Sequence, residues 1–142
     1  MSLSAEAQIR NLVSRYAQAT LTRDSAAWAA TWSKNGIWEL MGNAAEGREA
    51  VLAYWETLMA NIPFAFQLAG EGSIEIDETG QRGIGRFPTL EFTKMGEGAG
   101  TLLLGTYEDV YVVEEGEWRF GERRMRIRYM GPPDMSGAPL PG

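Results

Sequence analysis

The spacing of apolar residues changes once along this chain, at Pro63, and that change limits the folds open to it. Before Pro63 the apolar residues recur every three or four positions, as they do on one face of an α-helix. After Pro63 they alternate with polar residues, which is the period of a half-buried β-strand. Helices followed by antiparallel strands are typical of an α+β fold, with the helices on one face of a strongly curved sheet. Such a sheet and its helices would enclose an apolar pocket for a small ligand.

Two of the predicted helices have clear boundaries. The first begins after Ser4, a candidate N-cap, and its apolar stripe ends at Leu21. The other begins near residues 46–48 and ends before Pro63, because proline disfavours helical geometry in the residue that precedes it.

A further helix is predicted between these two. Residues 24–25 are typical of a helix start, and Trp28 and Trp32 would then lie one turn apart on a single face. Asn35-Gly36 would end this helix. A short strand is expected to follow over residues 37–41.

The second half of the chain predicts antiparallel strands joined by turns. We expect them over residues 64–69, 73–77, 82–93, 101–113 and 117–130. The segment 131–142 is rich in proline and glycine, and we expect it to lie on the surface or to be disordered. Since no repeat or linker interrupts the pattern, the sequence predicts one domain over residues 1–130 followed by this tail.

Neither histidine nor cysteine occurs among the 142 residues, and their absence limits the possible chemistry. Without cysteine there is no disulfide, thiolate nucleophile or Cys-ligated metal. Without histidine there is no Ser-His-Asp triad and no His-containing zinc or iron site. Acid–base chemistry would have to come from Asp, Glu, Tyr, Lys or Arg. We expect no metal and no cofactor.

The charge of the chain argues against nucleic acid as a partner. Nineteen acidic residues against 13 basic ones give a net charge of −6, whereas binding to a phosphate backbone needs a basic surface. No apolar run is long enough to span a membrane, and the N-terminal residues do not resemble a signal peptide. We therefore expect a cytoplasmic protein with no membrane partner.

Several short motifs gain meaning in combination. Tyr16 is followed eight residues later by Asp24, and the segments WSKNGIW, GREA, GTYEDVY and GEWRF come after them, the last with Arg123-Arg124 close behind. Over residues 5–130 this combination resembles the NTF2-like superfamily, and its SnoaL-like branch in particular. The resemblance implies a cone-shaped α+β fold with a ligand pocket inside the cone.

The members of this superfamily include ketosteroid isomerase, scytalone dehydratase, polyketide cyclases, a hexachlorocyclohexane dehydrochlorinase and the β subunits of ring-hydroxylating dioxygenases. The dehydratase and dehydrochlorinase members typically pair an early Asp with a His at the start of the sheet, and many have an Arg on the last strand. Asp24 matches the Asp and Arg123 the Arg, while Gln67 stands where the His is expected. Because a Gln side chain cannot accept a proton at neutral pH, an Asp–His dyad is absent.

The resemblance implies a cofactor-independent lyase or isomerase, of dehydratase or cyclase type, that removes a proton from a small hydrophobic cyclic or aromatic substrate. In this hypothesis Asp24 is the base, Tyr16 and Arg123 stabilise the developing negative charge, and Gln67 is a polar contact. The aromatic walls of the pocket would be Trp28, Trp38 and Trp55.

Each assignment has a structural alternative that the sequence leaves open. Asp24 could serve only as a helix N-cap, and Tyr16 could be an ordinary core residue. Asp109 could be a second pocket carboxylate or the ion-pair partner of an arginine on the neighbouring strand. The whole chain could instead be a non-catalytic small-molecule-binding protein or an assembly subunit. In either case we expect a homodimer or homotrimer.

Overall fold

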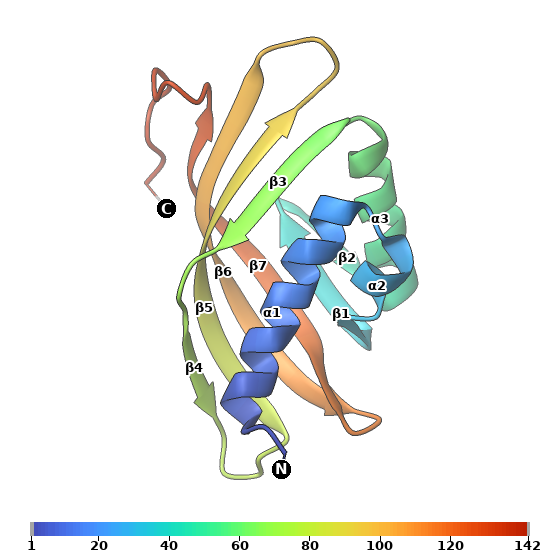
Figure 1. Cartoon of the computed structure of the whole chain (residues 1–142). Coiled ribbons are helices and arrows are strands. Elements are labelled where there is room, and N and C mark those ends of the chain that lie inside the picture. Colours follow the sequence, from blue (N-terminus) through green and yellow to red (C-terminus); the bar gives the residue numbers. More distant parts are fainter. Residues whose placement is uncertain (1, 142) are drawn as a thin grey trace.

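The computed structural model describes residues 2–141 as three helices and a curved sheet (Figure 1). The helices are α1 (Ala5–Thr22), α2 (Ser25–Ala29) and α3 (Arg48–Ala60). The strands are β1 (Trp32–Leu40), β2 (Asn43–Glu46), β3 (Phe64–Ala69), β4 (Ser73–Ile76), β5 (Arg82–Lys94), β6 (Gly100–Glu114) and β7 (Glu117–Gly131).

The sheet is mixed, and its strand directions place several strand ends together. The order is β2-β1-β7-β6-β5-β3. The strand β4 also pairs with β5, along the first part of β5, whereas β3 pairs with its second part. The β1–β7 pair is parallel, and every other pair is antiparallel. Since β5 and β7 both run opposite to β6, the strands β1, β5 and β7 share one direction. Their carboxyl ends therefore meet at the same edge of the sheet.

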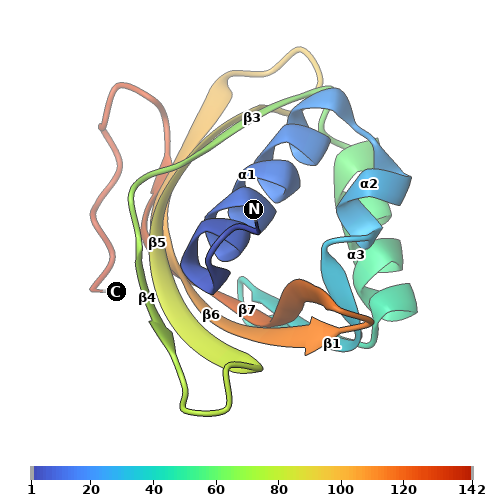
Figure 2. The same cartoon turned by 60° about the horizontal axis from the view of Figure 1, so that its bottom comes forward.

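The three helices lie on the concave side of the sheet. Figure 2 shows the sheet curving around α1, with α2 and α3 on the side away from β4 and β5. The curvature is accompanied by irregular register between β6 and β7, next to Gly105 and Tyr111. A Cβ at Gly105 would lie 2.6 Å from the carbonyl oxygen of Arg126, so only glycine fits there. The predicted α+β architecture is confirmed, and the sheet is not closed into a barrel.

Both ends of α1 are capped by neighbouring residues. The Ser4 hydroxyl accepts the Ala7 backbone N–H at 3.1 Å, which confirms the predicted start. Arg23 follows the helix in the left-handed region, with φ of 56°, and its backbone N–H caps the last turn. The buried residues on the helix are spaced three or four apart, so α1 packs one face on the sheet.

The second predicted helix is shorter than the sequence pattern indicated. It ends near Ala29, and Trp32 begins β1 by pairing with Phe120 in β7. The Phe120 backbone N–H donates to the Thr31 carbonyl at 2.8 Å, so pairing with β7 ends the helix early. Gly36 lies inside β1 and does not stop a helix. A Cβ there would lie 2.8 Å from the Trp32 ring.

The strand β2 was not predicted, because its residues show no alternating apolar pattern. It forms a short hairpin with β1 through a turn at Met41 and Gly42, which have φ values of 52° and 79°. The strand predicted over residues 37–41 begins five residues earlier, at Trp32, whereas α3 and the five strands after Pro63 lie where expected, to within a residue or two.

The core between helices and sheet is rich in aromatic rings. Trp28 stacks on Trp55 with ring centroids 4.7 Å apart and an interplanar angle of 14°. The ring centroids of Trp32 on β1 and Trp28 on α2 are 5.7 Å apart. None of the helices described in residues 2–141 is long and apolar enough to cross a membrane.

Candidate functional site

A cavity of about 150 Å³ lies between the concave face of the sheet and the helices α1 and α3. Leucine, isoleucine, methionine and tryptophan side chains make up most of its wall. The hydrogen-bonding groups on the wall include Tyr16, Gln67, Glu91 and Tyr107. An apolar cavity with a few converging polar groups is typical of a small-molecule site.

A larger hollow of about 700 Å³ lies outside α1 and α2, and it has a different character. Its charged lining residues, Arg15 and Glu117, are both exposed to solvent. The cavity inside the cone, with its buried polar groups, is therefore the stronger candidate for chemistry.

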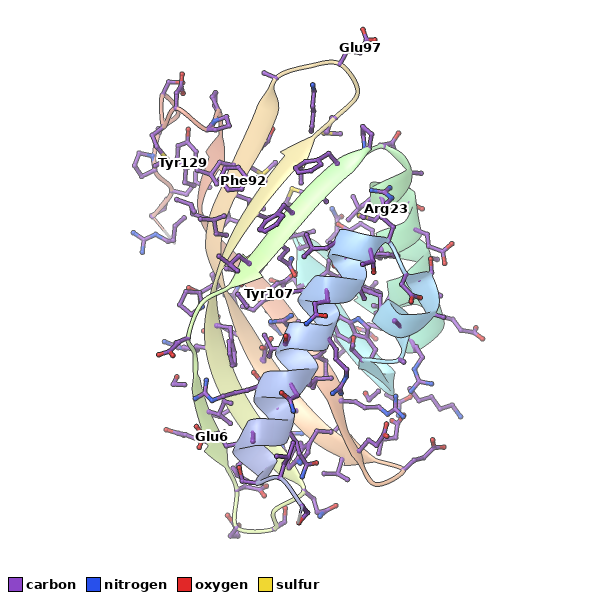
Figure 3. All side chains as sticks on the ribbon, viewed as in Figure 1. Glu6, Arg23, Phe92, Glu97, Tyr107 and Tyr129 are labelled. Atoms are coloured by element: carbon purple, nitrogen blue, oxygen red, sulfur yellow. The ribbon has the colours of Figure 1, made fainter. Side chains whose placement is uncertain are left out.

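Two tyrosine hydroxyls meet in the cavity wall. The Tyr16 and Tyr107 hydroxyl oxygens are 3.3 Å apart, and the Trp38 indole N–H donates to the Tyr107 oxygen at 3.1 Å. The tyrosine pair has two hydroxyl protons and uses one of them in its mutual hydrogen bond, so the other can be donated to a ligand. Burial raises the pKa of both tyrosines, which keeps them protonated. Figure 3 shows Tyr107 on the inner side of the sheet, behind α1.

A carboxylate that the sequence analysis did not single out lines the same cavity. Glu91 on β5 lies opposite Gln67 on β3, and the Gln67 amide donates to Glu91 Oε2 at 3.0 Å. Burial raises the pKa of Glu91, and the hydrogen bond from Gln67 acts in the opposite direction. A carboxylate with a raised pKa is a stronger base than an exposed one.

The position of Glu91 along β5 indicates that its side chain points into the cavity. Phe87 and Thr89 are buried, and Glu91 has the same parity along the strand, so its side chain points inward as theirs do. Gly83, Gly85 and Pro88 interrupt the alternation of side chains along this strand, which hides the inward position of Glu91 in the sequence.

Arg123 is buried but does not line the cavity, so its predicted place in the pocket wall is wrong. Its guanidinium makes two hydrogen bonds to Asp109, at 2.8 and 3.1 Å, and Tyr111 donates a third to the same carboxylate at 2.8 Å. A buried guanidinium without a partner would be costly, which explains the ion pair. The alternative in which Asp109 pairs with an arginine of the next strand is confirmed.

The buried guanidinium packs directly behind the tyrosine pair. Its central carbon lies 3.8 Å from the ring centroid of Tyr107 and 4.5 Å from that of Tyr16. Contacts of this kind are cation–π interactions, and they hold the aromatic rings in place. Arg123 therefore influences the cavity through the two tyrosines.

Asp24 does not reach the cavity, and its predicted orientation into an apolar chamber is wrong. Its side chain is exposed, and Oδ1 accepts the Ala27 backbone N–H at 3.0 Å at the start of α2. The left-handed turn at Arg23 directs the chain so that the carboxylate faces the free N–H groups of α2. The N-cap alternative is therefore the one that the structure supports.

The predicted aromatic walls are only partly observed. Trp38 and Trp55 line the cavity, as do Tyr16 and Gln67. Trp28 is fully buried behind Trp55 and is not part of the cavity wall. It packs against the side of Trp55 that faces away from the cavity and so supports the wall.

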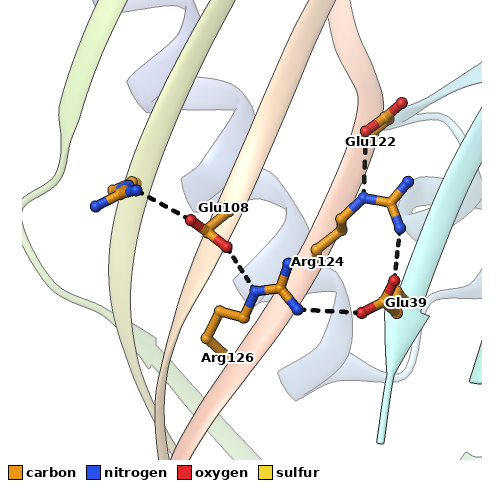
Figure 4. A network of polar contacts seen from close by, with 6 residues as sticks. Glu39, Glu108, Glu122, Arg124 and Arg126 are labelled. Carbon is orange, nitrogen blue, oxygen red and sulfur yellow. Dashed lines mark hydrogen bonds and ion pairs between the residues drawn. The ribbon is translucent and has the colours of Figure 1, made fainter. Parts of the chain in front are cut away.

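Two further arginines of β7, Arg124 and Arg126, pair with acidic residues on the outer face of the sheet. Figure 4 shows Arg126 between Glu108 and Glu39, and Arg124 between Glu39 and Glu122. The contacts to Glu108 and Glu39 are cross-strand pairs, as the alternation of β7 predicts, whereas Glu122 lies on β7 itself. In the part of the chain that the structure describes, no cluster of three acidic residues could hold a metal ion.

Comparison with known proteins places this geometry in a family. The SnoaL-like domain family matches residues 1–124. A hexachlorocyclohexane dehydrochlorinase, LinA type 2, has a similar structure, with a TM-score of 0.83, 19% identity and coverage of 97% of this chain and 95% of its own. A scytalone dehydratase-like protein from Novosphingobium aromaticivorans has a TM-score of 0.83 and 18% identity, over 96% and 93% of the two chains.

A third solved structure is somewhat closer in sequence. It is a protein of unknown function from Mycobacterium tuberculosis, with 26% identity and a TM-score of 0.75, over 84% of this chain and 74% of its own. No curated protein sequence matches the chain. The fold is therefore NTF2-like, as the sequence motifs indicated.

Proposed function

The chain belongs to the SnoaL-like domain family, and on that premise we propose that it is a lyase or isomerase acting on a small apolar ring compound. One observation carries the proposal: a carboxylate with a raised pKa shares an apolar cavity with a pair of tyrosine hydroxyls. A base and a hydrogen-bond donor in one water-poor site are the two groups that proton abstraction next to a carbonyl needs.

In the proposed reaction Glu91 takes the place that the sequence assigned to Asp24. Its carboxylate removes a proton from the carbon next to the substrate carbonyl, and the electrons of the C–H bond move toward the carbonyl oxygen. The free proton of the tyrosine pair is donated as a hydrogen bond to that oxygen. In isomerisation, the enolate takes the proton back from Glu91 at another carbon. In elimination, the enolate expels a leaving group from the neighbouring carbon, and this group departs with the proton held by Glu91, so that the carboxylate is regenerated in both cases.

The other predicted residues support these two groups. Gln67 holds the Glu91 carboxylate in place, and Arg123 fixes the tyrosine rings from behind. Trp38 donates to Tyr107, which leaves the tyrosine proton for the substrate. The reaction as written needs no cofactor.

The size of the cavity points to a substrate with a single ring. An engineered apolar cavity of about 150 Å³ in another protein accommodates benzene, whereas drug-sized ligands occupy roughly 300–1,000 Å³. The cavity here has a volume of about 150 Å³, so one six-membered ring fills it.

Hydrogen–deuterium exchange tests the proposed base without knowledge of the natural substrate. We expect the protein to accelerate exchange of the acidic C–H protons of 2-cyclohexenone in D2O, followed by NMR. Glu91→Gln should slow this exchange by roughly 10²–10⁴-fold, the usual contribution of a general base. Tyr107→Phe should slow it less than Glu91→Gln, because Tyr16 can still donate.

The control is Glu75→Gln, which alters an exposed carboxylate on β4. It should exchange at the rate of the unchanged protein. If Glu91→Gln also kept the full rate, the assignment of the base would be wrong. Quenching of the Trp38 and Trp55 fluorescence by the ketone separates loss of chemistry from loss of binding.

A non-catalytic binding or assembly subunit is the second candidate function. The amide of Gln67 at the position expected for a histidine base favours it. A protein of this kind would bind the ketone without accelerating exchange, or would be purified together with a partner chain.

We also propose that the chain forms a homodimer or homotrimer through the outer face of the sheet. Phe64, Phe66 and Leu68 on β3 are exposed by 54%, 41% and 56%, and Phe92 on β5 is exposed by 39%. Phe66 and Phe92 are direct cross-strand neighbours, so these side chains form a continuous apolar patch.

A further inference from the structure

Methionine is over-represented in the wall of the cavity. The sequence has seven methionines, and five of them line this one cavity: Met41, Met59, Met95, Met125 and Met130. Two of the five, Met59 and Met125, are buried. The other three are exposed by 47%, 56% and 47%, in chain order. Every other lining residue is buried or only partly exposed, so the cavity reaches bulk solvent past three thioether side chains.

The topology of the sheet brings these three methionines together. Met41 follows the last residue of β1, Met95 follows the last residue of β5, and Met130 is the second-last residue of β7. Because β1, β5 and β7 run in one direction, their carboxyl ends lie at the same edge of the sheet. The three side chains therefore gather at one end of the cone, although they are far apart in sequence.

We propose that Met41, Met95 and Met130 form the entrance of the cavity and select ligands by an apolar substituent that extends from the ring toward solvent. The ligand class is then a single ring with a polar group at one end and an apolar chain of variable length at the other. This inference concerns binding and does not depend on Glu91 acting as a base.

The two ends of the cavity differ in stiffness, and that difference supports the proposal. The inner wall has Trp38, Trp55 and the tyrosine pair, whose rings are held by stacking and hydrogen bonds. Methionine has a flexible, unbranched and polarisable side chain, which adapts to apolar groups of different shape. The inner end therefore fixes the ring, and the entrance adjusts to what extends from it.

A homologous series of ligands tests the entrance directly. The probes are 4-alkylphenols from methyl to hexyl, with binding followed by tryptophan fluorescence. For the unchanged protein we expect affinity to rise with each methylene that contacts the entrance, by up to about fourfold per methylene. Glutamine has nearly the length of methionine but is polar, so the triple variant M41Q/M95Q/M130Q should lose this rise for the longer chains. Its affinity for 4-methylphenol should stay within about twofold.

Two control variants sharpen the result. Met135→Gln alters a methionine that is 50% exposed but outside the cavity, and it should bind the whole series as the unchanged protein does. The triple leucine variant M41L/M95L/M130L keeps an apolar entrance, so affinity should still rise with chain length.

Three outcomes would overturn the proposal. In the first, the triple glutamine variant binds every phenol like the unchanged protein. In the second, it loses affinity equally for the methyl and hexyl members. In the third, the unchanged protein shows no rise with chain length. Proton exchange with 2-cyclohexenone, which has no alkyl chain, is a separate measurement. The proposed catalytic function and the proposed entrance can therefore be contradicted independently of each other.

Discussion

At the scale of single residues, the surroundings of a carboxylate decide what it can do. Glu91 lies in an apolar wall, where burial raises its pKa and makes it a better proton acceptor. Asp24 lies in solvent, and its side chain accepts a backbone N–H at the start of a helix. The two acids are therefore suited to different tasks, catalysis and capping.

The raised pKa of Glu91 predicts how stability depends on pH. A carboxyl group whose pKa is higher in the folded state than in the unfolded state favours folding below the unfolded pKa, and this contribution is lost as pH rises through the folded pKa. The unfolded value is near 4.5. The unchanged protein should therefore lose stability as pH rises above 4.5, whereas Glu91→Gln should not. The free energy of unfolding of Glu91→Gln, measured with urea, should increase relative to that of the unchanged protein over this range. A constant difference from pH 4 to pH 8 would contradict the raised pKa.

Substitutions at Asp24 separate its two possible roles. Asp24→Ala removes the cap and should lower the free energy of unfolding by about 0.5–2 kcal/mol. Asp24→Asn keeps a capping oxygen, so it should change stability little and leave proton exchange with 2-cyclohexenone intact. Urea unfolding and the exchange rate are the two measurements. If Asp24→Asn abolished proton exchange with 2-cyclohexenone, Asp24 would be the base and the assignment of Glu91 would be contradicted.

At the scale of secondary-structure elements, β7 carries two kinds of arginine. Arg123 points inward and forms a buried ion pair with Asp109, whereas Arg126 points outward and is about half exposed. Buried pairs and exposed pairs differ in energy, because an uncompensated charge is costly only where water cannot reach it.

This contrast gives a paired prediction on one strand. Arg123→Met should lower the free energy of unfolding by about 3–5 kcal/mol, because it leaves Asp109 buried without its partner. Arg126→Met should cost less than about 1 kcal/mol, and added salt should reduce that cost further. In the double variant Arg123→Met with Asp109→Leu, part of the loss should return. Thermal or urea unfolding measures all three, and equal effects at the two arginines would contradict the burial argument.

The secondary-structure elements also show which features of the fold could be predicted from the sequence and which could not. Periodicity is a local signal, so the long helices and strands followed from it, and the change at Pro63 set the fold class. The end of α2 depends on pairing between Trp32 and Phe120, which are distant in sequence, and local propensity extended the helix too far. The ion pair of Arg123 and the position of Glu91 opposite Gln67 likewise depend on strand register. Tyr16 and Trp38 could be assigned because both stand in the motifs that resemble the family, and Trp55 because it lies on the apolar face of its helix.

At the scale of the whole molecule, the two faces of the sheet have different surfaces. The concave face is covered by helices, while the outer face combines the ion-pair network of Figure 4 with the apolar patch around Phe66 and Phe92. Exposed apolar patches of this kind mark contact surfaces.

Removal of the patch should shift the assembly toward the monomer. We expect the variant F66S/F92S to sediment as a smaller species than the unchanged protein at the same concentration. Ile84→Ser alters a residue that is 51% exposed at the other end of β5, and it should leave sedimentation unchanged. A monomeric unchanged protein would contradict the proposed assembly.

Arg23 connects the end of α1 to the end of α3, and this has a consequence for motion. Its guanidinium donates to the carbonyl oxygens of Met59 and Ile62, two residues of the cavity wall. Outward swinging of α3 would break both hydrogen bonds at once. Rotation of the methionine side chains at the cavity entrance would leave both bonds intact, so it costs less than a displacement of α3.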